Sequence, residues 1–283
     1  MNYWNFVGYK TDHPIFLATD SISTPCVQNT LGCTLAKSET EVIDVIYVDD
    51  AYVPKANWSA SKLSPSKVTC TEPSNTIAVI QIPQEVFKAF RNSGVHEIQT
   101  SEDRICVEQS ISFKNAVAQF TNFARQFHVE ERDIIHNGLA VHLPGKTTTT
   151  YERHNQLFVG LHVDSWDHRT LGQRRDSRNR ICVNIGKKNR FLICVPSELV
   201  GLAMRISPAG HVLDSNFRNV NRIVTSYLDQ NQDLPIFRIG IRPGEAYIAP
   251  TENMIHDGST LESDCIDVNY TLRGLFNPML AKA

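Results

Sequence analysis

The chain has 283 residues, and its hydrophobic content of 41% is ordinary for a globular protein with a packed core, which excludes wholesale disorder. The 28 Lys and Arg residues are balanced by 30 Asp and Glu residues, so the net charge of −2 argues against a globally basic nucleic-acid-binding protein. No apolar run of about 18 residues occurs, so the sequence predicts no transmembrane helix.

The first part of the chain is expected to mix helices and strands. Residues 41–48 and 77–82 are rich in β-branched residues, which favours buried strands. Residues 49–76 carry several Pro, Ser and Thr, which indicates a long loop with short strands. Pro83 stands at a plausible first-turn position, and residues 84–92 are predicted to form the helix that follows it.

A second helix is indicated by apolar residues that recur at steps of three and four. They are Phe113, Val117, Phe120, Ala124 and Phe127. This spacing places them on one face of a helix of about four turns. We expect that face to pack on the outside of a sheet rather than to form a cofactor or partner groove.

From about residue 134 the pattern changes to short β-rich runs separated by Gly and Pro. The predicted strands are 139–143, 156–164, 180–185, 191–195, 236–241, 246–248 and 265–276. Many short strands with such punctuation indicate a mainly β fold with flanking helices, either a barrel or a double-sheet sandwich. No flexible linker divides the chain, so residues 1–283 are expected to form one compact domain. In it, the α/β elements of residues 1–135 would pack on a core of residues 136–276.

The seven cysteines are dispersed, and no two of them form a C-x-x-C pair. Residues 1–6 show neither the basic segment nor the apolar segment of a signal peptide. Both observations predict reduced thiols in a cytoplasmic protein and argue against a zinc site of four cysteines.

The strongest chemical signal is the run Leu161-His162-Val163-Asp164, which closes a predicted strand. Residues two apart on a strand project from the same face, so His162 and Asp164 can hold one metal ion together. The best third ligand is His256, which follows a turn, a short strand and a second turn at Pro250. Two histidines and one carboxylate form the facial triad of non-haem Fe(II) oxygenases.

The last predicted strand adds a polar face to this set. Asp267, Asn269, Thr271 and Arg273 alternate with apolar residues, so they share one side of the strand. Polar side chains inside a barrel are costly unless they meet a ligand or one another. The guanidinium of Arg273 is suited to a carboxylate, with the hydroxyl of Thr271 beside it.

Residues 136–276 thereby resemble the Fe(II)/2-oxoglutarate-dependent oxygenases, whose pattern is H-x-D, a distal histidine and a basic residue on a following strand. The resemblance implies a double-stranded β-helix, or jelly-roll, of the cupin-like kind. It implies that His162, Asp164 and His256 bind Fe(II), and that Arg273, helped by Thr271, anchors the cosubstrate 2-oxoglutarate. Dioxygen would be the oxidant. The presence of Asp164 favours hydroxylation over halogenation, because the halogenating members of the family lack this carboxylate.

Several alternatives stay open at this stage. Arg180 and Arg238, on other predicted strands, compete with Arg273 for the anchor. Three protein ligands and a water would also suit a zinc-dependent hydrolase or a cupin-type isomerase. The chain could instead be a non-catalytic β-barrel that binds a metal and a small ligand.

Residues 165–190 hold eight Lys or Arg residues against Asp167 and Asp176, a net of +6 in a chain of net −2. This segment could recognise an anionic group near the metal site, or it could be a solvated surface loop. Aromatic residues do not alternate with these charges as they do in nucleic-acid-binding segments, so no nucleic-acid or membrane partner is expected. The expected substrate is a small, anionic or amino-acid-like metabolite, and no oligomeric state is predicted.

Overall fold

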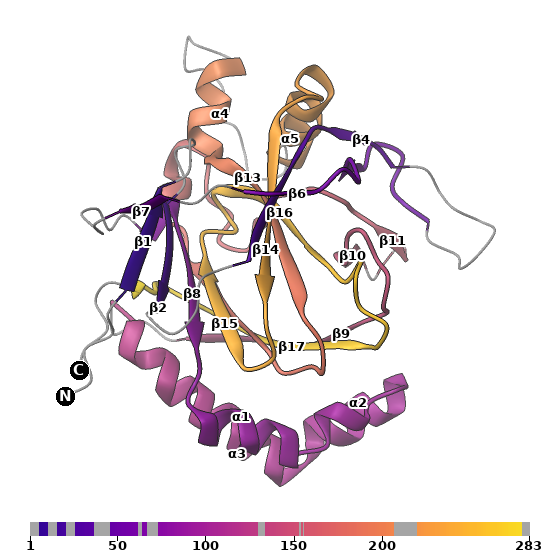
Figure 1. Cartoon of the computed structure of the whole chain (residues 1–283), viewed down its shortest axis with the longest axis vertical. Helices are drawn as coiled ribbons and strands as arrows, with labels where there is room; N and C mark the ends of the chain where they lie inside the picture. The colour runs from indigo at the N-terminus through magenta and orange to yellow at the C-terminus, as the bar shows by residue number, and fades with distance from the viewer. Residues whose placement is uncertain are drawn as a thin grey trace.

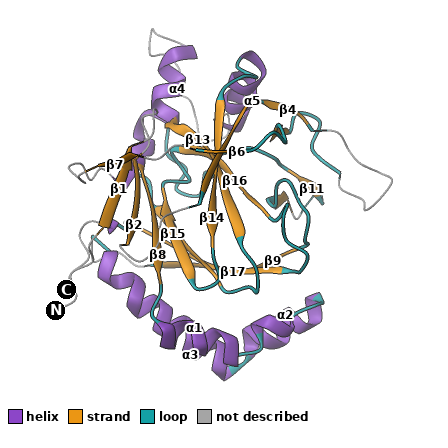
Figure 2. Cartoon of the chain, viewed as in Figure 1, coloured by secondary structure: helices purple, strands orange, loops and turns teal. Residues whose placement is uncertain are grey.

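The computed structural model describes residues 6–10, 16–20, 26–36, 46–61, 64–66, 73–129, 134–152, 154, 156–206 and 220–278. These residues form two main β-sheets that face each other, with helices at their outer sides (Figures 1 and 2). The fold class predicted from the sequence, mainly β with flanking helices, is therefore confirmed. Within the described residues, no helix is both long enough and apolar enough to cross a membrane.

The larger sheet has eight strands, and neighbouring strands are antiparallel except for the parallel pair β2–β8. In order across the sheet, they are β7 (Ser64–Ser66), β1 (Phe6–Lys10), β2 (Phe16–Asp20), β8 (Thr76–Gln81), β15 (Glu245–Ala249), β12 (Asn179–Asn184), β17 (Asp267–Gly274) and β9 (Ile135–His142).

The smaller sheet has five strands, all paired antiparallel. Its order is β16 (Met254–Ser259), β13 (Arg190–Glu198), β14 (Pro235–Ile241), β3 (Val27–Leu31) and β6 (Ser59–Ala60). Two further pairs are β4 (Cys33–Leu35) with β5 (Tyr52–Pro54), and β10 (Tyr151–Glu152) with β11 (Leu157–Phe158).

The chain passes back and forth between the two sheets from β12 onwards. Strand β12 lies in the larger sheet, β13 and β14 in the smaller, β15 in the larger, β16 in the smaller and β17 in the larger. This alternation makes the core a double-stranded β-helix, or jelly-roll, which closes around its own inner faces. Strands from residues 6–81 extend both sheets.

Three helices cover the outer face of the larger sheet: α1 (Gln84–Asn92), α2 (Ser101–Gln109) and α3 (Ile111–Ala124) (Figure 1). The predicted aromatic stripe packs there. Phe90, Phe113 and Phe120 surround the ring of Tyr270 on β17 at centroid distances of 5.8–6.4 Å. The stripe therefore belongs to the core and is not a cofactor groove.

Two helices pack near the other end of the sheets: α4 (Leu199–Ile206) and α5 (Val220–Gln230) (Figure 1). Leu202, Val224 and Leu228 are buried there in a second hydrophobic cluster. The short 3-10 helices are η1 (Pro73–Asn75), η2 (Val95–Glu97), η3 (Arg125–Phe127) and η4 (Leu171–Asp176).

One strand prediction needs correction, and one strand was missed. The strand expected over 156–164 is wrong in its extent, because only Leu157–Phe158 forms β11. Gly160, with a φ of +72°, interrupts the extended backbone, and His162 then pairs with His256 as an isolated bridge. Most of the strand expected over 41–48 lies outside the described residues. Strand β16, around His256, was not predicted.

Candidate metal centre

Backbone pairing brings the H-x-D segment against β16. The amide of His162 donates to the carbonyl of His256 at 3.1 Å, and the amide of His256 donates back at 2.8 Å. The amide of Asp164 donates to the carbonyl of Thr251 at 3.1 Å. These bonds fix the three residues on adjacent backbone segments, although His162 and His256 are 94 positions apart in the sequence.

The side chains of His162, Asp164 and His256 converge. Nε2 of His162 lies 3.8 Å from Oδ1 of Asp164, and Nε2 of His256 lies 3.7 Å from Oδ2. One donor atom from each residue fits within 4.8 Å of the others, and all three residues are buried. The structure thus brings together the three residues that the sequence predicts as metal ligands.

Backbone carbonyls orient both imidazoles. Nδ1 of His162 lies 2.8 Å from the carbonyl of Gly160, and Nδ1 of His256 lies 3.0 Å from that of Met254. A carbonyl only accepts, so each Nδ1 carries a proton, and in the neutral imidazole each Nε2 presents a lone pair towards Asp164. Nε2 of His256 is buried without a hydrogen-bond partner among the described residues. Such an unsatisfied buried nitrogen beside a carboxylate fits a metal ion.

Gly160 forms the backbone turn that precedes His162. Its φ is +72°, and a Cβ atom there would lie 2.5 Å from the carbonyl oxygen of Tyr52. Only glycine combines that backbone conformation with so close an approach. The position therefore delivers both the turn before His162 and the carbonyl that orients its ring.

Asp257 supports the same histidine, and sequence reasoning missed it. Oδ1 of Asp257 accepts from the amides of Thr149 and Thr150 at 3.0 Å each, while Oδ2 lies 3.6 Å from Nδ1 of His162. The residue is fully buried. Its position next to His256 in sequence was the only available signal, and it gave no hint of contact with His162.

The charge states suit metal binding. Burial lowers the pKa of His256 to about 4, so its imidazole is neutral at pH 7. Burial would raise the pKa of Asp164, but Arg180 and the two histidines outweigh burial and hold that pKa well below its ordinary value. For His162, burial lowers the pKa, yet Asp257 and Asp164 together raise it above its ordinary value. The raised pKa favours a proton on Nε2 of His162, and a metal cation bound there would displace that proton.

A cavity of about 160 Å³ opens beside His256, between the two sheets. Its polar lining includes Arg180, Arg190, Tyr247, Asn269 and Thr271. Arg180 is committed to the metal ligand Asp164, because its Nη2 donates to Oδ2 of that carboxylate. Among the described residues, the partners of Arg190 lie at longer distances, with Nη1 3.4 Å from Sγ of Cys182 and Nε 3.7 Å from Oδ2 of Asp267.

The other predicted anchor residues lie as follows. Thr271 lines the cavity, whereas Arg273 is not among its lining residues. Nη2 of Arg273 donates to Asp167 at 2.7 Å and to Glu252 at 2.9 Å. The rival Arg238 bonds Gln28 and Glu262 and packs over Trp58, outside this cavity. The assignment of Arg273 as cosubstrate anchor stays a prediction.

Two histidines and one carboxylate on one side of an ion leave its other positions open to ligands, as in non-haem Fe(II) sites. The same donors would also hold a catalytic zinc ion. The site therefore combines three oriented donors, a buried setting and a cationic cavity beside them.

Neither a protein-family model nor a curated protein matches the sequence. Among solved structures, the chain is similar to the Kdo hydroxylase KdoO, a non-heme Fe(II) alphaketoglutarate dependent dioxygenase, in complex with cobalt(II). The identity is 12% and the TM-score 0.43, over 75% of this chain and 83% of that one. The complex of KdoO with alphaketoglutarate and Fe(III) aligns over the same shares at 13% identity and a TM-score of 0.42. These low values do not assign the chain to a family, so the function proposed below rests on its own residues.

Proposed function

We propose that the chain is an Fe(II)/2-oxoglutarate-dependent oxygenase that hydroxylates a C–H bond of a small, anionic or amino-acid-like metabolite. The observation that carries this proposal is the convergence of His162, Asp164 and His256, with both Nε2 atoms close to the carboxylate of Asp164 and a cationic cavity at their side. An iron ion held there would supply the redox chemistry that couples the oxidation of 2-oxoglutarate by dioxygen to the oxidation of the substrate.

The chain's own residues would bind the metal and orient its ligands. The carbonyls of Gly160 and Met254 keep the lone pairs of His162 and His256 aimed inwards. Arg180 holds Asp164 in its anionic form, and Asp257 steadies the ring of His162. Because all three donors are buried, the site also excludes bulk water, which protects reactive species from side reactions.

The cavity beside His256 is the proposed cosubstrate site. We assign the anchor for the far carboxylate of 2-oxoglutarate to Arg190, because it lines this cavity and its ion pair with Asp267 is long, with 3.7 Å between Nε and Oδ2. Thr271 and Tyr247 offer hydroxyl groups in the same cavity. The competing assignment is Arg273, which would have to leave Asp167 and Glu252 to fill this role.

Metal reconstitution with a turnover assay tests the function. The metal-free protein is loaded anaerobically with Fe(II) or Zn(II), and 2-oxoglutarate and air are then added with a panel of small amino acids and organic anions. Succinate is measured. We expect succinate with iron only, no succinate from the His256→Ala variant, and full activity from the control His154→Ala, which alters an exposed histidine.

Other results support the alternatives. Stoichiometric zinc in the isolated protein, with no succinate from any iron-loaded sample, would indicate a zinc-dependent hydrolase or a cupin-type isomerase. Tight binding of 2-oxoglutarate without turnover across the whole panel would indicate a non-catalytic barrel.

A further inference from the structure

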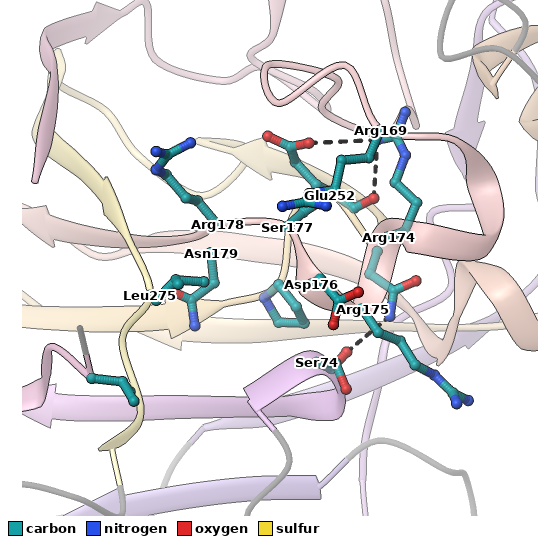
Figure 3. Close-up of a pocket in the computed structure, with 13 residues that line it drawn as sticks. Ser74, Arg169, Arg174, Arg175, Asp176, Ser177, Arg178, Asn179, Glu252 and Leu275 are labelled. Atoms are coloured by element: carbon teal, nitrogen blue, oxygen red, sulfur yellow. Dashed lines mark hydrogen bonds and ion pairs between the residues drawn. The ribbon is translucent and has the colours of Figure 1, made fainter. Parts of the chain in front are cut away.

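A second and larger cavity, of about 590 Å³, lies where η4 meets the start of β12 and the turn before β16 (Figure 3). Its lining shares no residue with that of the cavity beside His256. Four arginines of the Arg-rich segment border it, against two carboxylates: Arg169, Arg174, Arg175, Arg178, Asp176 and Glu252. The cavity is thus separate from the proposed cosubstrate site and carries excess positive charge.

Three of the four arginines already have carboxylate partners. Arg174 is buried beside Glu252, with 3.8 Å between Nη1 and Oε2. Arg175 pairs with Glu198 at 2.7 Å, and Arg178 pairs with Asp167 at 2.9 Å. Arg169 forms no ion pair with any residue that the structure describes. Its charge is therefore available to an incoming anion.

Three residues of the cavity's lining each have a buried polar atom, with almost no accessible surface, that lacks a hydrogen-bond partner among the described residues. These atoms are Nε of Arg174, Oγ of Ser177 and Oδ1 of Asn253. The first can only donate, the last can only accept, and the hydroxyl can do either. Buried polar groups are nearly always satisfied in native proteins, so a polar ligand towards which these side chains turn would satisfy three groups at once.

We propose that this cavity binds a small hydroxylated anion. Its charged group, a carboxylate or a phosphate, would meet Arg169 and Nε of Arg174, since guanidinium groups bind both anions. A hydroxyl group of the ligand would donate to Oδ1 of Asn253, and another would pair with Ser177. The ligand would lie directly behind the metal centre, because Nη1 of Arg174 also donates to the backbone carbonyl of Asp164.

Calorimetric titration of the metal-free full-length protein tests this proposal. The probes are glycerol 3-phosphate and glycerate, which combine hydroxyl groups with a phosphate or a carboxylate. The comparison probes are glycerol, which has no charge, and inorganic phosphate and acetate, which have no carbon-bound hydroxyl. We expect one of the first two probes to bind, and to bind more tightly than all three comparison probes. Which of the two binds better identifies the charged group.

Two variants locate the binding. Arg169→Gln removes the charge that has no ion-pair partner among the described residues, and it should weaken binding about ten-fold or more, because a charge-assisted hydrogen bond is lost. Ser177→Ala should weaken it by a smaller factor. Arg222→Gln, at an exposed position of α5, is the matched control and should bind as the unchanged protein does. Circular dichroism confirms that each variant is folded.

Three results would overturn the proposal. They are no binding of any probe at millimolar concentration, equal affinity for glycerol 3-phosphate and inorganic phosphate, and unchanged affinity in folded Arg169→Gln and Ser177→Ala. Because no metal is present in the titration, failure of the proposed oxygenase activity would leave its outcome unaffected.

Discussion

Replacing Arg190 by alanine tests where the cosubstrate's carboxylate is held. Arg190 is 4% exposed, at the start of β13, and it lines the cavity next to His256. Its nearest carboxylate, Asp267, lies 3.7 Å from Nε, while Asp267 also accepts a hydrogen bond from His142 at 2.9 Å. The guanidinium is therefore buried with only part of its hydrogen-bonding capacity used.

The size of the effect follows from that burial. Truncating one partner of a buried, hydrogen-bonded charge pair costs about 2–5 kcal/mol. At about 1.4 kcal/mol per decade, the affinity for 2-oxoglutarate should fall by roughly 30- to 3000-fold. Arg190→Lys should retain more affinity than alanine but less than arginine, because a point charge does not replace the planar fork. Iron binding should be nearly unchanged, since Arg190 is not among the three donors.

The assay is an anaerobic titration of 2-oxoglutarate into the Fe(II)-loaded protein, with Arg190→Ala, Arg273→Ala and Arg238→Ala compared. In Arg273→Ala we expect affinity within a few-fold of the unchanged protein but a lower unfolding free energy, because Asp167 and Glu252 lose a buried partner. Normal affinity in Arg190→Ala with lost affinity in folded Arg273→Ala would refute this assignment and restore the one made from the sequence.

Three further predictions concern metal affinity and stability. Asp257→Asn removes the carboxylate beside His162 and should weaken Fe(II) binding about 10- to 100-fold in a chelator competition, whereas unchanged affinity would deny Asp257 a positioning role. Phe120→Ala opens the aromatic cluster around Tyr270 and should lower the unfolding free energy by about 3–5 kcal/mol in urea; a loss under 1 kcal/mol would mean that this cluster contributes little. Thr100→Ala removes the capping box of α2 and should cost about 1 kcal/mol in the same assay, with no change in iron affinity, and a stability equal to that of the unchanged protein would argue against the cap.

Alternation along a strand explains why much of the core was predictable. In β17, Val268, Tyr270 and Leu272 belong to the hydrophobic cluster under the helices, as their spacing predicts. The same two-residue alternation of side chains puts His162 and Asp164 on one side of their segment. Local spacing therefore carries enough information to place side chains on faces.

Contacts between distant segments were not predictable in the same way. The ion pairs of Arg273 with Asp167 and Glu252 join three separate segments, and no local pattern identifies such partners. Strand β16 was missed because its residues, which include His256, Asp257 and Gly258, lack the apolar alternation of a half-buried strand. Its pairing with β13 holds it extended instead.

An anaerobic crystal structure of the protein with Fe(II) and 2-oxoglutarate tests the central claim most directly. We expect one iron ion bound by Nε2 of His162, a carboxylate oxygen of Asp164 and Nε2 of His256, with 2-oxoglutarate in the cavity beside His256. An ion bound elsewhere, or 2-oxoglutarate outside that cavity, would contradict the proposed oxygenase site.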